Sequence, residues 1–244
     1  MVTVCLWQHK DFVVNEYKIK HHKLIRSVLD NFNADFFFTN SIYFGGGTRI
    51  ALEIDEYRES IDVDFLCPNM ESYRAVRQEV TSNSLGSLVK KEFCYAREIK
   101  FDRYGVRTFI MEENTPIKLE IVSFDNYDLI ADARQLFPVP FIDHESCFYT
   151  KLLANSDRCL LAQCKDIFDI LAMHEAWGGI PQSAIKKAEK HYGSAVLNDL
   201  IRSLKDIQTK QEYYYQLAEG MLIQPEFAQK LIDYVAPQIL EKIS

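Results

Sequence analysis

The stretch Ile42-Tyr43-Phe44-Gly45-Gly46-Gly47-Thr48, followed by Ile61-Asp62-Val63-Asp64-Phe65-Leu66, decides the fold. The first run is an apolar strand that ends in glycines, and a helix starting there would present bare backbone N–H groups that can grip phosphate. Asp62 lies fourteen residues after Thr48. Asp62 and Asp64 are two residues apart, so both carboxylates point to the same face of a strand and can hold Mg²⁺ beside that phosphate. The two runs together predict a site for nucleotide chemistry.

The composition indicates a folded chain that is large enough to bury a core. The chain has 244 residues, 48% of them hydrophobic and 26% charged, which allows one large domain or two modest ones. No run approaches the about eighteen apolar residues of a membrane span, and the N-terminus lacks the pattern of a signal peptide. We therefore expect a cytoplasmic protein without membrane contact.

The charge sets a condition on any nucleic-acid partner. The net charge of −7 gives no overall attraction to a polyanion, so a nucleic acid would need a local basic patch. Residues 18–26 and 186–191 are basic enough to form one, although a solvated helix face is the favoured explanation of each segment. The six cysteines show neither a Cys-x-x-Cys pair nor a histidine at zinc spacing, so we expect reduced, mostly buried thiols.

The hydrophobic pattern predicts an α+β fold with two parts. We expect a mixed sheet with helices, the nucleotidyltransferase type of catalytic domain, over residues 1–140 and an all-α domain that completes the nucleotide cleft over residues 141–244. Expected helices cover 11–32, 48–57 and 70–88 in the first part and 145–155, 159–177, 181–191, 194–204, 210–221 and 225–242 in the second. Expected strands cover 41–44, 61–67, 92–99, 106–112 and 117–124.

A third carboxylate is needed if the site clamps two metal ions during nucleotidyl transfer. The run Pro116-Ile117-Lys118-Leu119-Glu120-Ile121-Val122-Ser123-Phe124 contains Glu120 in an otherwise apolar pattern. Strand alternation puts Glu120 on the face opposite Leu119 and Ile121. Glu120 is therefore the candidate for the second metal site and for the acceptor of the proton from the attacking hydroxyl. An exposed glutamate on a half-wet strand is the alternative.

The arrangement resembles the nucleotidyltransferases of the DNA polymerase beta superfamily, and more narrowly the AbiEii/AbiGii toxin family. The narrower resemblance rests on Phe44-Gly-Gly-Gly-Thr48, on Ala51-Leu52, and on Arg58-Glu-Ser60-Ile-Asp62-Val-Asp64-Phe65. Arg49 departs from the family's pattern, because a small or apolar residue is expected there. As a first-turn arginine it would touch a phosphate or face water.

A second block extends the resemblance to about residue 170. Phe148-Tyr-Thr-Lys151-Leu-Leu-Ala154, Asp157-Arg158 and Lys165-Asp166-Ile-Phe-Asp169-Ile are similar to the family's helical motifs. Lys151 and Arg158 are seven residues apart, two helical turns, so they can share a face and reach a triphosphate. An ion-pair network on the helix surface is the alternative. The resemblance implies a nucleotide-binding set of Gly46, Gly47, Thr48, Arg58, Lys151, Arg158 and Asp166, beside the catalytic and metal-binding Asp62, Asp64 and Glu120.

The resemblance also implies a function. We expect an enzyme that uses two Mg²⁺ ions to move NMP from an NTP to a hydroxyl of an RNA, such as tRNA, or of a protein. Family members act as toxins of toxin-antitoxin pairs, so an antitoxin protein is an implied partner. Two alternatives stay open: a non-catalytic interaction protein that retains this fold, and a glycosyltransferase that uses its Asp-x-Asp to hold Mn²⁺ and a nucleotide-sugar.

Overall fold

The computed structural model describes residues 17–161 and 165–243. A mixed six-stranded sheet forms the first part, with the order β1-β2-β6-β5-β3 and with β4 also paired to β5. Its strands are β1 (Tyr43–Gly45), β2 (Asp62–Cys67), β3 (Cys94–Tyr95), β4 (Lys100–Phe101), β5 (Gly105–Glu112) and β6 (Thr115–Ser123). Among these named strands, β2 and β6 pair in parallel and the other pairs are antiparallel. The α+β class is confirmed.

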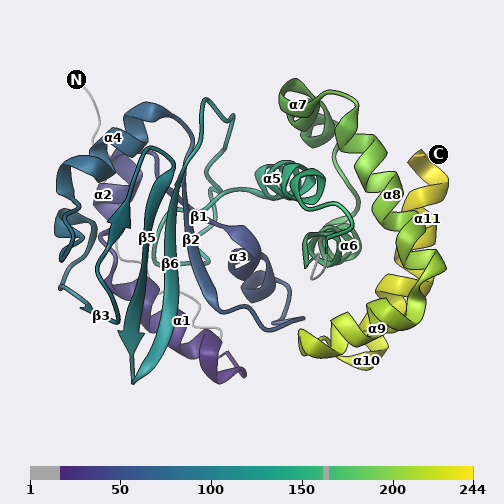
Figure 1. Cartoon of the computed structure of the whole chain (residues 1–244), viewed down its shortest axis with the longest axis horizontal. Coiled ribbons are helices and arrows are strands. Elements are labelled where there is room, and N and C mark those ends of the chain that lie inside the picture. Colours follow the sequence, from purple (N-terminus) through teal and green to yellow (C-terminus); the bar gives the residue numbers. More distant parts are fainter. Residues whose placement is uncertain (1–16, 162–164, 244) are drawn as a thin grey trace.

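The helices of the first part lie on both faces of this sheet (Figure 1). They are α1 (Lys20–Asn31), α2 (Ala34–Thr39), α3 (Gly46–Glu53), α4 (Met70–Glu79) and the 3₁₀ turn η1 (Gly86–Leu88). One hydrophobic cluster joins α1, α2 and α4 to the sheet face that carries Leu119 and Ile121. On the other face, α3 contacts β1 and β2 and extends the core of the helical part.

The second part is helical, as expected. It contains α5 (His144–Asp157), α6 (Lys165–Trp177), α7 (Gln182–Tyr192), α8 (Ala195–Thr209), α9 (Gln211–Gly220), α10 (Pro225–Gln229), the π-helical segment η2 (Lys230–Val235) and α11 (Ala236–Ile243). Asp143 caps α5 by accepting a hydrogen bond from the Ser146 backbone N–H. Figure 1 shows α7 to α11 forming an arc around α5 and α6, which face the sheet. None of the described helices is both long and apolar enough to cross a bilayer.

Several expected elements differ from those in the structure. The first helix begins at Lys20 within the described residues, and residues 11–16 of the expected helix lie outside them. The helix α2, which no pattern indicated, is capped by the Asn33 side chain. Of the strand expected over 92–99, only β3 (Cys94–Tyr95) is present, and β4 (Lys100–Phe101) follows just beyond it; both pair with β5. The helix expected over 70–88 ends at Glu79 because Val80 takes an extended conformation.

Candidate active site

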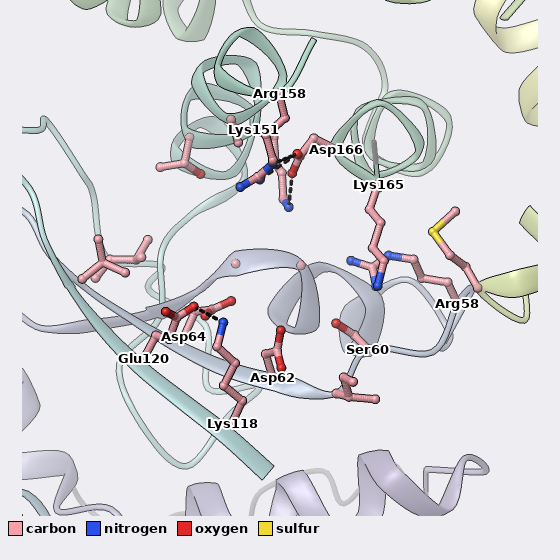
Figure 2. Close-up of a pocket in the computed structure, with 18 of the residues that line it drawn as sticks. Arg58, Ser60, Asp62, Asp64, Lys118, Glu120, Lys151, Arg158, Lys165 and Asp166 are labelled. Atoms are coloured by element: carbon pink, nitrogen blue, oxygen red, sulfur yellow. Dashed lines mark hydrogen bonds and ion pairs between the residues drawn. The ribbon is translucent and has the colours of Figure 1, made fainter. Parts of the chain in front are cut away.

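A cleft of about 550 Å³ opens between the sheet and the helices α5 and α6. Figure 2 shows two walls: carboxylates of β2 and β6 on one side, and charged side chains of α5 and α6 on the other. Nine of the ten site residues indicated by the sequence line this cleft: Gly46, Gly47, Arg58, Asp62, Asp64, Glu120, Lys151, Arg158 and Asp166. The tenth, Thr48, is buried next to it.

The glycine turn between β1 and α3 leaves no room for side chains. Gly46 has φ +70°, and a Cβ there would lie 2.1 Å from Asp64 Oδ2. A Cβ on Gly47 would lie 2.2 Å from Arg58 Nη2. The two glycines are therefore needed by the protein's own packing, since they let a carboxylate and a guanidinium approach the start of the helix. The same turn keeps the backbone at the N-terminus of α3 open to the cleft.

Thr48 holds the neighbouring strand rather than lining the cleft. Its Oγ1 lies 2.7 Å from Ser60 Oγ and within hydrogen-bonding distance of the Asp62 carbonyl oxygen. Ser60 itself lines the cleft, and its backbone N–H donates to Nε2 of the buried His22. Thr48 thus fixes the start of β2, directly beside the aspartate pair.

The register of the sheet brings the three carboxylates together. Asp64 lies opposite Glu120 on the parallel strand β6, and Asp62 lies opposite Lys118. Desolvation and the negative charges of Asp62 and Glu120 raise the pKa of Asp64 to about 7. The carboxylate of Asp64 is therefore short of positive charge, and a cation bound there would relieve it.

Glu120 has positive partners of its own. Lys118 Nζ lies 2.6 Å from Glu120 Oε2, and Arg107 Nε of β5 lies 3.4 Å from Glu120 Oε1. The pKa of Lys118 is raised by its hydrogen bond to Glu120 and by the charges of all three acids, against the opposing effect of desolvation. Lys118 and Arg107 were not among the residues indicated by the sequence. Lys118 shares the strand face of Glu120 by simple alternation, which is the signal that could have found it.

The helical wall is a network of buried ion pairs. Lys151 Nζ lies 2.9 Å from Asp166 Oδ1 and 2.6 Å from Asp169 Oδ2. Arg158 donates from Nε to Asp166 Oδ2 over 2.7 Å. Lys151 is only 8% exposed. The two aspartates hold its pKa above the usual range although desolvation opposes this, so the ammonium stays charged at the edge of the cleft.

Asp169 is the centre of this wall. It is fully buried and accepts hydrogen bonds from Nε and Nη2 of Arg58 at 2.8 and 3.2 Å, and from the Tyr57 hydroxyl. Burial favours its neutral form, but Arg58 and Lys151 outweigh burial and lower its pKa. The sequence places Asp169 one turn after Asp166 on the same helix face, yet only the fold reveals that Arg58 and Lys151 meet there.

Arg49 corrects the expectation for the first turn of α3. It neither touches the cleft nor faces water, because it is fully buried. Its Nη1 lies 2.6 Å from Glu53 Oε2, and its guanidinium packs over the rings of Phe141 and Trp177. Arg49 therefore ties α3 to the segment before α5 and to the end of α6.

The donor set of the sheet wall fits a hard divalent cation in its chemistry. Carboxylate oxygens are the ligands that Mg²⁺ prefers, and the raised pKa of Asp64 indicates negative charge that its partners do not offset. Among residues 17–161 and 165–243, however, no three acidic, histidine or cysteine side chains are already arranged as a metal cluster. Glu120 pairs with Lys118, so as a third carboxylate ligand it would have to exchange that partner for metal.

The sheet, the glycine turn and the paired aspartates together define a nucleotidyltransferase. Residues 27–234 match the model of the family described as "Nucleotidyl transferase AbiEii toxin, Type IV TA system". The match spans most of the chain, so the protein belongs to this family. It is a nucleotidyltransferase, which decides against the glycosyltransferase alternative.

Two solved structures are similar to this chain. The crystal structure of a putative nucleotidyltransferase from H. pylori matches with a TM-score of 0.55 at 16% identity, covering 91% of this chain and 94% of that one. An antigenic nucleotidyltransferase-like protein from Paracoccidioides brasiliensis matches with a TM-score of 0.43 at 16% identity, covering 84% of this chain and 97% of that one. No curated protein matches the sequence.

Proposed function

We propose that the protein binds an NTP in the cleft and transfers its NMP group to a hydroxyl of an RNA or a protein. The observation that carries this proposal is the opposition of the two walls beside the N-terminus of α3. The wall with Asp62, Asp64 and Glu120 faces the wall with Lys151 and Arg158 (Figure 2). Asp64 is short of positive charge, and Gly46 and Gly47 line the same cleft. A triphosphate with its metal ions satisfies both walls at once.

The phosphates are held by the helix start and by the helical wall. Gly46 and Gly47 offer backbone N–H groups at the positive end of α3. Lys151 and Arg158 add positive charge from the helical wall, and Arg58 lines the same cleft. Asp166 and Asp169 hold the side chains of Lys151 and Arg158 in place. These two cations are therefore already ordered when a triphosphate binds. Thr48 acts indirectly, because its hydrogen bond to the Asp62 carbonyl oxygen fixes the backbone of Asp62.

Asp62, Asp64 and Glu120 are the residues that would hold two Mg²⁺ ions. When bound, the ions would offset negative charge on the carboxylates and on the transferring phosphate. Glu120 is also the candidate base for the acceptor hydroxyl. In this reaction the hydroxyl oxygen attacks the α-phosphorus, the bond to the bridging oxygen breaks, pyrophosphate leaves and the hydroxyl proton passes to Glu120.

The biological role proposed is that of the toxin of a type IV toxin-antitoxin pair, with an antitoxin protein as its partner. The family match supports this role. Modification of a hydroxyl on an RNA such as tRNA, or on a protein, would stop growth in the way expected of a toxin.

The test is a transfer assay with each α-labelled NTP, Mg²⁺ and a total cell extract. We expect one labelled RNA or protein band that disappears with EDTA and with Asp62→Asn. Label in the band with wild-type protein but equally with Asp62→Asn would contradict the assignment. Absence of any labelled acceptor with all four NTPs would contradict transfer itself.

A further inference from the structure

The cleft face of the sheet continues outward beyond the carboxylates, and the strand register arranges its side chains in two rows. In the first row, Asp64 of β2 lies opposite Glu120, Glu120 opposite Arg107, and Arg107 opposite Lys100. In the second row, Asp62 lies opposite Lys118, and Lys118 opposite Phe109. Neighbouring strands are about 4.8 Å apart. The last residue of each row, Lys100 or Phe109, therefore lies within roughly 15 Å of the aspartate at its start.

The outer part of these rows forms what we call the outer strip: Arg97, Lys100, Arg107, Phe109 and Lys118. Arg97 joins it because its guanidinium lies 4.4 Å from the centre of the Phe109 ring. All five side chains are exposed or half-buried. The opposite face of β5 and β6 is the one buried against α1 and α4, and on the cleft face α3 packs on β1 and β2.

The outer strip has the chemistry of a nucleic-acid surface. In a chain of net charge −7, it gathers four cations around one aromatic ring. Arg107 pairs with Asp102 and Glu120, and Lys118 pairs with Glu120. Arg97 and Lys100, in contrast, form no ion pair within the described part of the chain. Cations that follow a backbone of phosphates, next to a ring on which a base can stack, are typical of single-strand binding.

The two basic segments noted in the sequence are weaker candidates. In the first, Lys18 pairs with Asp55, Arg26 with Asp30, and His22 is buried. In the second, Lys187 is held between Asp128 and Glu145. Neither segment lines the cleft, whereas Lys118 of the outer strip does.

We propose that the outer strip docks a single-stranded nucleic acid and directs one of its hydroxyls toward Asp62, Asp64 and Glu120. This inference rests on the proposed function, because it names the acceptor class of that site and the surface that receives it. Phosphates lie against Arg97, Lys100, Arg107 and Lys118, and one base stacks on Phe109. The aromatic ring and the continuity with the carboxylates favour a nucleic acid over an acidic protein surface.

The experiment measures binding of a short labelled RNA, and of the DNA of the same sequence, by fluorescence anisotropy from about 50 to 200 mM salt. The double variant Arg97→Ala/Lys100→Ala should weaken RNA binding about tenfold. Two lost phosphate contacts, at about 0.7 each, should lower the log–log salt slope by about 1.4. Phe109→Leu should weaken binding at least about fivefold with the slope unchanged, because stacking is not ionic. RNA or DNA binding that responds in this way supports the strip and shows which of the two it takes.

The matched control is Lys186→Ala/Lys190→Ala, which removes the same charge from α7 and should change RNA affinity less than twofold. Equal losses in both double variants would overturn the proposal, since net charge alone would explain them. A strip variant that loses binding of a poly-glutamate peptide but keeps both nucleic acids would overturn it in favour of an acidic protein. Calorimetric NTP binding, which Arg97→Ala/Lys100→Ala should not change, separates the two proposals: wild-type protein that binds RNA through the strip but no NTP would contradict the proposed function alone.

Discussion

The two walls of the cleft contain aspartates in opposite electrostatic states. Asp64 on the sheet wall lies among other acids, which together with burial raise its pKa to about 7. Asp169 on the helical wall is buried between Arg58 and Lys151, which lower its pKa. The helical wall is balanced within itself, whereas Asp64 on the sheet wall lies among like charges. The difference indicates that the helical wall stabilises the fold, whereas the sheet wall is the side arranged for chemistry.

The comparison is tested most strongly by Asp64→Asn. We expect labelled NMP transfer to fall at least about a thousandfold, because several kcal/mol of charge stabilisation in the transition state depend on this ligand. The melting temperature should stay the same or rise, since repulsion among the three acids is relieved. The control Asp55→Asn removes an exposed acid outside the cleft and should keep full transfer. An Asp64→Asn protein with more than a tenth of wild-type activity would end the metal assignment.

The same substitution on the other wall should have the opposite signature. Asp169→Asn leaves Arg58 and Lys151 buried without their carboxylate, which should lower the free energy of unfolding by about 3–5 kcal/mol. Urea denaturation measures this, with Asp64→Asn as the matched control. If Asp169→Asn proved as stable as Asp64→Asn, the balance described for the helical wall would be wrong.

Two lysines of the cleft separate binding from stability. Lys151→Met should raise the KM for NTP about tenfold or more and also lower the melting temperature, because it breaks the pairs with Asp166 and Asp169. Lys165 also lines the cleft but is exposed and forms no ion pair among residues 17–161 and 165–243. Lys165→Met should therefore raise KM with little change in melting temperature. A Lys151→Met protein with wild-type KM would remove Lys151 from the triphosphate site.

The pH dependence of stability should also separate the walls. Asp64 has a folded pKa raised from 3.8 to about 7, so the folded state binds more protons than the unfolded state between these values. Its contribution to stability is therefore lost as the pH rises from about 4 to 7. In EDTA, wild type should lose about 3–4 kcal/mol relative to Asp64→Asn over this range. Asp169 has a lowered pKa and contributes in the opposite sense. Its contribution to stability is lost as the pH falls below the ordinary pKa of an aspartate.

Chemical denaturation at pH 4 and at pH 7 measures this pH dependence of stability. Excess Mg²⁺ at pH 7 should restore most of the difference, since a bound cation favours the ionised carboxylate. If the difference in free energy of unfolding between wild type and Asp64→Asn were independent of pH, the neighbouring acids would not raise the pKa of Asp64.

Local patterns in the sequence were enough for the parts of the site that lie within single elements. The glycines before Thr48 predicted the turn into α3, and the spacing of Asp62 and Asp64 predicted a shared strand face. Alternation along β6 indicated Glu120, which the register places opposite Asp64. Backbone conformation and side-chain direction follow from such short-range preferences, so these features could be read without the fold.

The remaining features depend on which distant segments pair, and no local pattern carries that information. The burial of Arg49 requires Phe141 and Trp177, and the clamp on Asp169 requires Arg58, more than a hundred residues away. The row from Asp64 through Glu120 and Arg107 to Lys100 exists only because four strands meet in one register. The sequence by itself indicated which residues are candidates for the chemistry. The tertiary structure decided which charges are balanced, because Coulomb interactions and desolvation depend on distance in space and not on distance along the chain.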